Sequence, residues 1–119
     1  MTMTDDQLLA SLERLEAALE ANGRRAEQMN ARIADIRRQR DAGRSYSEIV
    51  SEEHRPLVVE LLTESAQALF SAGVLVRRME AQALHREGMT MDQIARLFGV
   101  TRQRVSALLR DARLAQQHA

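Results

Sequence analysis

The sequence predicts an all-α protein, and three observations support that fold class. Aromatic residues make up 3% of the 119 residues and one Pro is present, whereas the helix formers Ala, Leu, Glu, Arg and Gln are plentiful. Apolar residues recur at heptad spacing through the first third of the chain, as in a coiled coil. Toward the C-terminus, two short amphipathic segments flank a glycine at the spacing of a helix-turn-helix. We therefore expect a long N-terminal coiled-coil-like helix, a second long helix and a C-terminal three-helix helix-turn-helix domain.

The charge distribution divides the chain in the same way. The net charge is zero, but residues 1–72 carry 9 Arg against 13 acidic residues, whereas residues 73–119 carry 8 Arg against 4. The basic excess coincides with the C-terminal motif, as binding to phosphate requires. We predict a helical dimerisation region over residues 1–76, a helix-turn-helix domain over residues 77–113 and a tail over residues 114–119.

The segment from Asp5 to Asp41 is predicted to form one helix. Its seam positions alternate in steps of four and three, at Leu8, Leu12, Leu15, Leu19, Asn22, Ala26, Met29, Ile33, Ile36 and Arg40. A seam of this length predicts a coiled coil and hence a homodimer. Asn22 and Gly23 together also resemble a helix end, which would give a hairpin of two shorter helices instead. The heptad phase runs through them without a slip and favours one continuous helix.

The partner of this helix stays open at the level of sequence. A parallel dimer would set Arg32 against Arg37 across the interface, and these side chains repel each other. Antiparallel packing and packing against the rest of the same chain are the alternatives.

A break and a short helix follow at residues 42–50. Gly43 is the expected hinge. Ser45 and Glu48 have the spacing of a capping box and predict the start of a helix. Tyr46 is expected to place its ring in the core and its hydroxyl at the surface.

The second long helix is predicted to run from about Leu57 to His85. Pro56 is expected in its first turn, where the missing N–H costs nothing. Gly73 interrupts the apolar face and is expected to kink the helix or to allow close helix approach.

The C-terminal motif begins with a helix that Thr90 caps, because Gln93 follows at the capping-box spacing. Gly99 is expected to end that helix in the left-handed conformation. The apolar face of this first helix comprises Ile94, Leu97 and Phe98.

Val100 is expected to fill the turn, and Thr101 to cap a second helix. Ala95 is small where the two helices cross, and it precedes Gly99 by four residues. This combination is typical of a helix-turn-helix. The buried stripe of the second helix is predicted to be Val105, Leu108, Leu109 and Ala112.

With Val105 at the centre of the buried stripe, about 100° of rotation per residue turns Gln103, Ala107 and Arg110 away from the core. A Gln amide can pair with adenine through two hydrogen bonds, and an Arg fork with guanine. Ala107 leaves room for a thymine methyl group. We therefore interpret this strip as a set of base-reading positions.

The segment GVTRQRVSALL resembles the recognition segment of the fourth conserved region of bacterial sigma factors, and the wider stretch resembles the helix-turn-helix domains of bacterial regulators. The resemblance implies a sequence-specific transcriptional regulator that binds double-stranded DNA. It implies that the DNA-facing positions are Thr101, Arg102, Gln103, Arg104, Ser106, Ala107 and Arg110. The chain lacks room for the promoter-melting and polymerase-binding regions of a sigma factor, so it is not expected to initiate transcription by itself.

Three other functions stay open. The motif is compatible with an interaction protein that binds RNA polymerase or another protein. It is also compatible with a nucleoid architectural protein without sequence preference. A ligand sensor is the third, because residues 45–75 have room for a small apolar cavity, although no polar cluster marks one.

Catalysis and bound cofactors are not expected. Cys is absent, and His54, His85 and His118 lie too far apart in sequence for a helical metal site. The acidic residues Glu52, Glu53, Glu60 and Glu64 are expected to be solvated. The N-terminus is unlike a signal peptide, and no apolar run is expected to reach the roughly 18 residues of a membrane span. We expect no membrane partner and a cytoplasmic location at the nucleoid.

Overall fold

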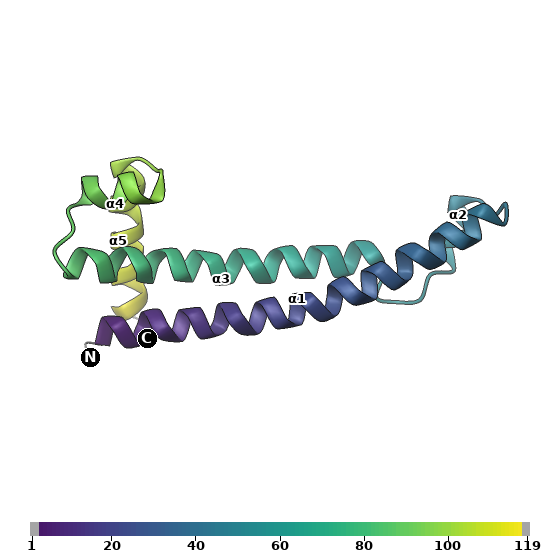
Figure 1. Ribbon diagram of the computed structural model, residues 1–119, viewed down its shortest axis with the longest axis horizontal. Helices are drawn as coiled ribbons and strands as arrows, with labels where there is room; N and C mark the ends of the chain where they lie inside the picture. Colours follow the sequence, from purple (N-terminus) through teal and green to yellow (C-terminus); the bar gives the residue numbers. More distant parts are fainter. Residues whose placement is uncertain (1–2, 118–119) are drawn as a thin grey trace. The chain divides into compact units, whose positions relative to one another are not determined.

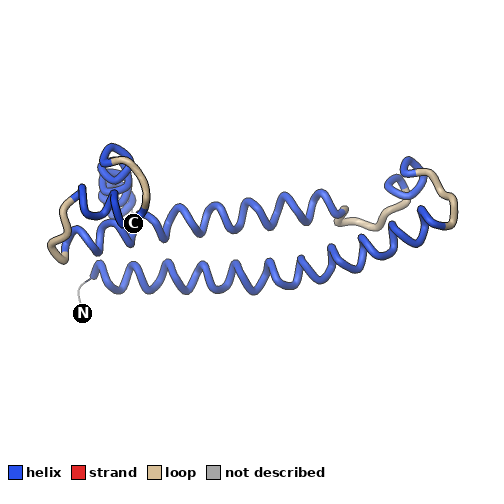
Figure 2. Tube along the Cα trace, turned by 45° about the horizontal axis from the view of Figure 1, so that its top comes forward, coloured by secondary structure: helices blue, strands red, loops and turns tan. Residues whose placement is uncertain are grey.

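The computed structural model describes residues 3–117, and this part of the chain contains five helices and no strand. They are α1 (Met3–Asp41), α2 (Tyr46–Ser51), α3 (Val58–Arg86), α4 (Met91–Phe98) and α5 (Arg102–Gln117) (Figure 1). Loops connect them without further regular structure (Figure 2). The predicted all-α class, with two long helices and a C-terminal helical domain, is confirmed.

The chain divides into two compact units. Unit 1 consists of Met1–Glu16 and Ser71–Ala119, and unit 2 of Ala17–Phe70. The start of α1 therefore belongs to the same compact unit as the end of α3, α4 and α5. Within the predicted tail, α5 continues to Gln117, and His118 lies outside the described residues.

In unit 2, α1 and α3 lie side by side and run in opposite directions (Figures 1 and 2). The amide nitrogen Nδ2 of Asn22 donates to the carbonyl oxygen of Ser65 at 3.1 Å. One turn further along α1, Arg25 Nε lies 3.6 Å from Glu64 Oε2. Because α1 continues through Asn22 and Gly23, the predicted continuous helix is confirmed and the hairpin alternative is excluded.

The face that α1 turns toward α3 differs from the predicted seam. The seam positions Asn22, Met29 and Ile36 are partly buried, but Leu19 and Ile33 are exposed. The inner face is completed instead by Ala18, Arg25, Arg32 and Gln39, each of which directly precedes one of the exposed seam positions Leu19, Ala26, Ile33 and Arg40. Half of the apolar seam therefore packs within the chain, because α3 approaches α1 from one side of the stripe.

The connection between α1 and α2 follows the predicted local pattern. Gly43 has a φ of 89°, and the Ser45 hydroxyl accepts a hydrogen bond from the backbone N–H of Glu48 at 3.2 Å. The prediction for Tyr46 was wrong: its side chain is exposed, and the Arg40 guanidinium lies 4.5 Å from the ring centroid. Tyr46 is the first residue of a helix of six residues, so its side chain points away from the small buried area that this helix can cover.

The start of α3 also differs from expectation. The helix begins at Val58, so Pro56 precedes its first turn. The Glu53 carboxylate accepts a hydrogen bond from the Val58 N–H at 2.9 Å, and that of Glu60 accepts one from Leu57 at 3.2 Å. The expectation of a solvated Glu53 was wrong, because its side chain is 7% exposed and lies 3.3 Å from Arg32.

Among the described residues, α3 is the one helix long and apolar enough to cross a membrane by length and composition. This corrects the expectation that no apolar segment is long enough to span a membrane. The mean hydropathy of a window within α3 is high although the helix contains isolated polar residues. Glu60 and Glu64 lie within it and form ion pairs with Arg55 and Arg25. By itself, a single helix of this kind is weak evidence for a membrane span.

Candidate nucleic-acid interface

The end of α3, α4 and α5 enclose one apolar core in unit 1. Its fully or nearly fully buried members are Ala81, Ile94, Ala95, Val105 and Leu108. Ala95 is buried, as expected where α4 and α5 approach each other, and Ala112 is buried further along α5. Leu84, Phe98 and Leu109 pack around this core. The predicted buried stripe of α5 is therefore confirmed, and α3 supplies the first helix of the trio without a break at Gly73.

Local hydrogen bonds fix the two ends of α4. Thr90 accepts from the backbone N–H of Gln93 at 3.1 Å, and the Gln93 side chain accepts from that of Thr90 at 2.9 Å. Gly99 ends the helix with φ 68° and ψ 36°, the left-handed conformation that a residue without Cβ adopts readily. Both predicted features of the turn are confirmed.

A side-chain hydrogen bond also caps the N-terminus of α5. The Thr101 hydroxyl accepts a hydrogen bond from the backbone N–H of Arg104 at 3.1 Å, so Thr101 caps the helix. The preceding residue, Val100, does not fill the turn, because 39% of it is exposed. Leu97 was also expected in the core but is 64% exposed, because α4 turns Ile94 and Ala95 inward and places Leu97 at the edge of its buried face.

The predicted site residues lie together on one side of α5 and at its N-terminus. Six of the seven are exposed, and Ala107 is partly buried. Gln103, Ala107 and Arg110 occupy the strip opposite the buried Val105. Within the residues that the structure describes, Arg110 forms no ion pair, so its guanidinium can approach another molecule without losing an internal partner.

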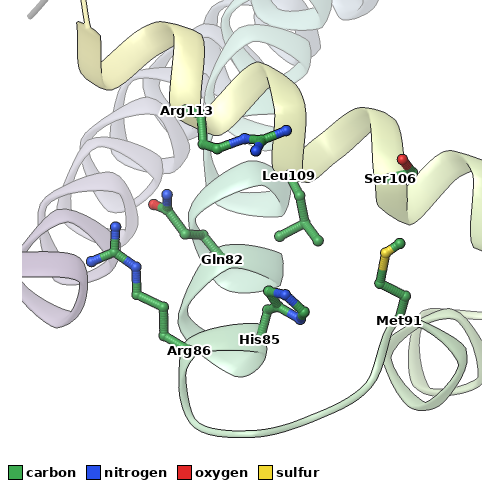
Figure 3. Close-up of a pocket in the computed structure, with 7 residues that line it drawn as sticks. All are labelled: Gln82, His85, Arg86, Met91, Ser106, Leu109 and Arg113. Carbon is green, nitrogen blue, oxygen red and sulfur yellow. The ribbon is translucent and has the colours of Figure 1, made fainter.

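Arg104 and Ser106 border this strip on its two sides. Ser106 lines a pocket of about 320 Å³ together with Leu109 and Arg113 of α5, Met91 of α4, and Gln82, His85 and Arg86 of α3 (Figure 3). Arg104 lines a second pocket of about 300 Å³, beside Arg77 and Glu80 of α3. Both residues therefore mark the edges of the exposed face, where α5 meets its own domain.

Two ion pairs that the sequence did not predict connect α5 to the other helices of its domain. Arg102 Nη1 lies 3.7 Å from Asp92 Oδ2 at the start of α4, and both side chains are largely exposed. Arg78 Nη2 lies 3.8 Å from Asp111 Oδ2, which joins α3 to the middle of α5. Neither pair follows a helical spacing, because the partners come from different helices, so the sequence carried no signal for them.

The usual metal-ligating side chains do not cluster in the part of the chain that the structure describes. Over residues 3–117, no three His, Cys, Asp or Glu side chains come together as they would around a metal ion. His85 is exposed, and its Nδ1 lies 3.2 Å from the carbonyl oxygen of Met89, which is an ordinary surface interaction.

Comparison with known proteins agrees with this geometry. The homeodomain-like domain family matches residues 73–115, just over a third of the chain, which contain α4, nearly all of α5 and the last part of α3. No curated protein and no solved structure matches the chain. The C-terminal part of the protein is therefore a helix-turn-helix DNA-binding domain. The match is to the homeodomain-like class, so the resemblance to the fourth conserved region of sigma factors stays a prediction.

Proposed function

We propose that the protein is a sequence-specific transcriptional regulator that binds double-stranded DNA as a homodimer, with α5 in the major groove. The observation that carries the proposal is the strip of the exposed Gln103 and Arg110 and the partly buried Ala107, on a helix whose opposite face is buried. The strip offers an amide and a guanidinium, the two groups best suited to adenine and guanine edges. We place the protein in the cytoplasm, at the nucleoid.

The N-terminus of α5 supports the same orientation. Thr101 and Arg102 are exposed there, and the first N–H groups of a helix favour phosphate. The pair between Arg102 and Asp92 is long and exposed, so it contributes little and is easily exchanged for a phosphate contact. In a two-fold dimer, the two copies of α5 are expected to reach half-sites about 34–36 Å apart, or a multiple of that spacing.

The test is DNA binding by matched variants. A preferred site is first selected from random duplexes, and fluorescence anisotropy then gives affinity at several salt concentrations. Gln103→Ala and Arg110→Ala are each expected to remove roughly 1–3 kcal/mol of discrimination at one base pair. Arg102→Ala is expected to weaken all sequences alike and to reduce the salt slope by about 0.9. Arg24→Ala, an exposed arginine of unit 2, is the control.

An unchanged DNA affinity after simultaneous replacement of Arg102, Gln103, Arg104 and Arg110 by Ala would contradict the proposal, provided that the variant remains helical. Equal affinity for every duplex in the selection would instead indicate a nucleoid architectural protein.

Exposed apolar groups on the domain favour a second candidate function. Leu97 and Val100 present apolar surface beside the turn, and surface of this kind suits a protein partner. RNA polymerase is one such partner. Co-purification with polymerase that survives nuclease treatment, together with no retention on DNA at low salt, would favour this function.

A further inference from the structure

Unit 2 carries a broad apolar face that no part of the described chain covers. We define the open face by seven residues: Leu19, Ala26 and Ile33 of α1, and Val59, Leu62, Ala66 and Leu69 of α3. The five larger side chains are exposed by 52% at Leu19, 44% at Ile33, 64% at Val59, 58% at Leu62 and 44% at Leu69. No charged residue belongs to the set.

Helical geometry places these residues on the same side of the helix pair. In each helix the open positions follow the inner ones by one residue, as Leu19 follows Ala18 and Leu62 follows Leu61. Each step rotates the position by about 100° in the same sense when the helix is viewed from its N-terminus. Because α1 and α3 run in opposite directions, this rotation carries both sets to one side of the plane through the two axes. The opposite side carries polar residues that include Gln28, Asp35 and Glu64.

The registers of the two helices also agree. The hydrogen bond from Asn22 to the Ser65 carbonyl fixes their alignment. Leu19 then lies level with Leu69, and Ala26 with Leu62, because the helices are antiparallel. The open face therefore consists of successive layers that repeat every seven residues, which is the spacing that knobs-into-holes packing requires.

The described residues of unit 2 enclose almost no core without a partner. Of its apolar residues, Ile49 and Leu61 are the ones that are buried. In a pair of helices, each helix buries one apolar stripe against the other. In a four-helix bundle, each helix also buries a second stripe against the other pair. The open face is the surface that would become the second half of such a core.

Its size reaches the minimum for a specific interface. A half-exposed Leu, Ile or Val leaves on the order of 100 Å² open. The five larger side chains thus present roughly 500 Å² per chain, and two copies bury about 1,000 Å² from these side chains alone, which is the lower bound for a specific interface. A single open patch of this size is at the upper end for a monomer.

We infer that the open face binds the open face of a second copy of this chain, so that the two helix pairs form an antiparallel four-helix bundle. A copy supplies layers of the same seven-residue spacing, and it brings apolar residues together without like charges between them. A lipid occupant fits less well, because Glu60 and Glu64 lie on the same helix. The inference rests on the proposed function, a homodimeric regulator, and identifies the surface through which that homodimer forms.

The test compares two glutamates on one helix. Leu62→Glu places a charge on the open face, whereas Gln67→Glu places one on the opposite side of α3, at an exposed residue one turn from Glu64. Sedimentation equilibrium without DNA is expected to show a dimer for the natural chain and for Gln67→Glu. For Leu62→Glu the dimer dissociation constant is expected to rise roughly 100-fold or more, because a carboxylate would be buried without a partner. Helix content by circular dichroism checks that both variants are folded.

A cysteine substitution tests the same face without placing a charge on it, so the result does not depend on whether a charged variant folds. The chain contains no Cys, so Ala66→Cys introduces a single thiol on the open face. Two copies paired through this face bring both thiols to one interface, so a bismaleimide cross-linker is expected to join them, and to join Gln67→Cys far less.

Three results would overturn the inference. The first is a natural chain that is still monomeric at about 100 μM, and the second is a dimer that Leu62→Glu leaves unaffected. The third is uptake of the natural chain by phosphatidylcholine–phosphatidylglycerol vesicles that Leu62→Glu abolishes. Because the measurements contain no DNA, a negative result refutes pairing through the open face but does not refute DNA binding by α5. A dimer that binds no DNA would leave the interface intact, and a monomer that binds a half-site would leave the DNA-binding role intact.

Discussion

Replacement of Gly99 by Ala is expected to destabilise unit 1 by about 1 kcal/mol, although the new methyl group meets no atom within 4 Å. The cost arises from the backbone, since φ is 68° at this residue. An L-residue pays roughly 1–2 kcal/mol in the left-handed region, and the loss of unfolded-state freedom returns about 0.4–1 kcal/mol.

Gly23→Ala is the matched control. This glycine lies inside α1, and a Cβ there also meets nothing within 4 Å. The same chemical change is therefore expected to stabilise unit 2 by roughly 0.5–1 kcal/mol, because Ala favours the helical conformation. The opposite signs follow from the backbone angles alone.

The assay must report on each unit separately. Amide hydrogen exchange measured at fixed protein concentration gives the opening free energy of α4 and α5 and that of unit 2 in one experiment. A shift of the same sign for Gly99→Ala in unit 1 and Gly23→Ala in unit 2 would refute the reasoning, since the left-handed conformation would then carry no cost.

Two further predictions concern charges in unit 2. Arg32→Met leaves the buried Glu53 carboxylate without its ion-pair partner, and the opening free energy of unit 2 by hydrogen exchange is expected to fall by about 2–3 kcal/mol. The control, Arg38→Met, breaks the exposed pair with Asp35 and is expected to lower it by under about 1 kcal/mol. Equal losses would contradict the role of burial. Hydrogen bonds from the Ser45 hydroxyl and backbone N–H, with the nearby Arg44 guanidinium, hold the pKa of Glu48 below its ordinary value. A lowered folded-state pKa stabilises the fold above the unfolded pKa, and this contribution is lost as the pH falls through the folded one. Ser45→Ala is expected to raise the pKa of Glu48 in an NMR titration, and an unchanged pKa would show that the cap does not hold the carboxylate.

The features that the sequence predicted correctly depend on residues a few positions apart. The capping boxes at Ser45 and Thr90 and the left-handed Gly99 involve partners within four residues, so their geometry follows from local chemistry. The continuity of α1 and the buried stripe of α5 depend on periodicity along one helix, which the sequence also contains.

The features that the sequence did not predict depend on which neighbour a helix meets. The leucine-rich stripe of α1 is wider than one partner can cover, so the position of α3 decided that Leu19 and Ile33 stay exposed. Leu97 faces solvent and Glu53 is buried for the same kind of reason, because another helix or loop occupies one side and not the other. By itself the sequence determined the caps of α2, α4 and α5, the continuity of α1 and which residues of α5 oppose its core. Only the tertiary structure decided which apolar residues are covered, because burial requires a second surface whose position no local spacing encodes.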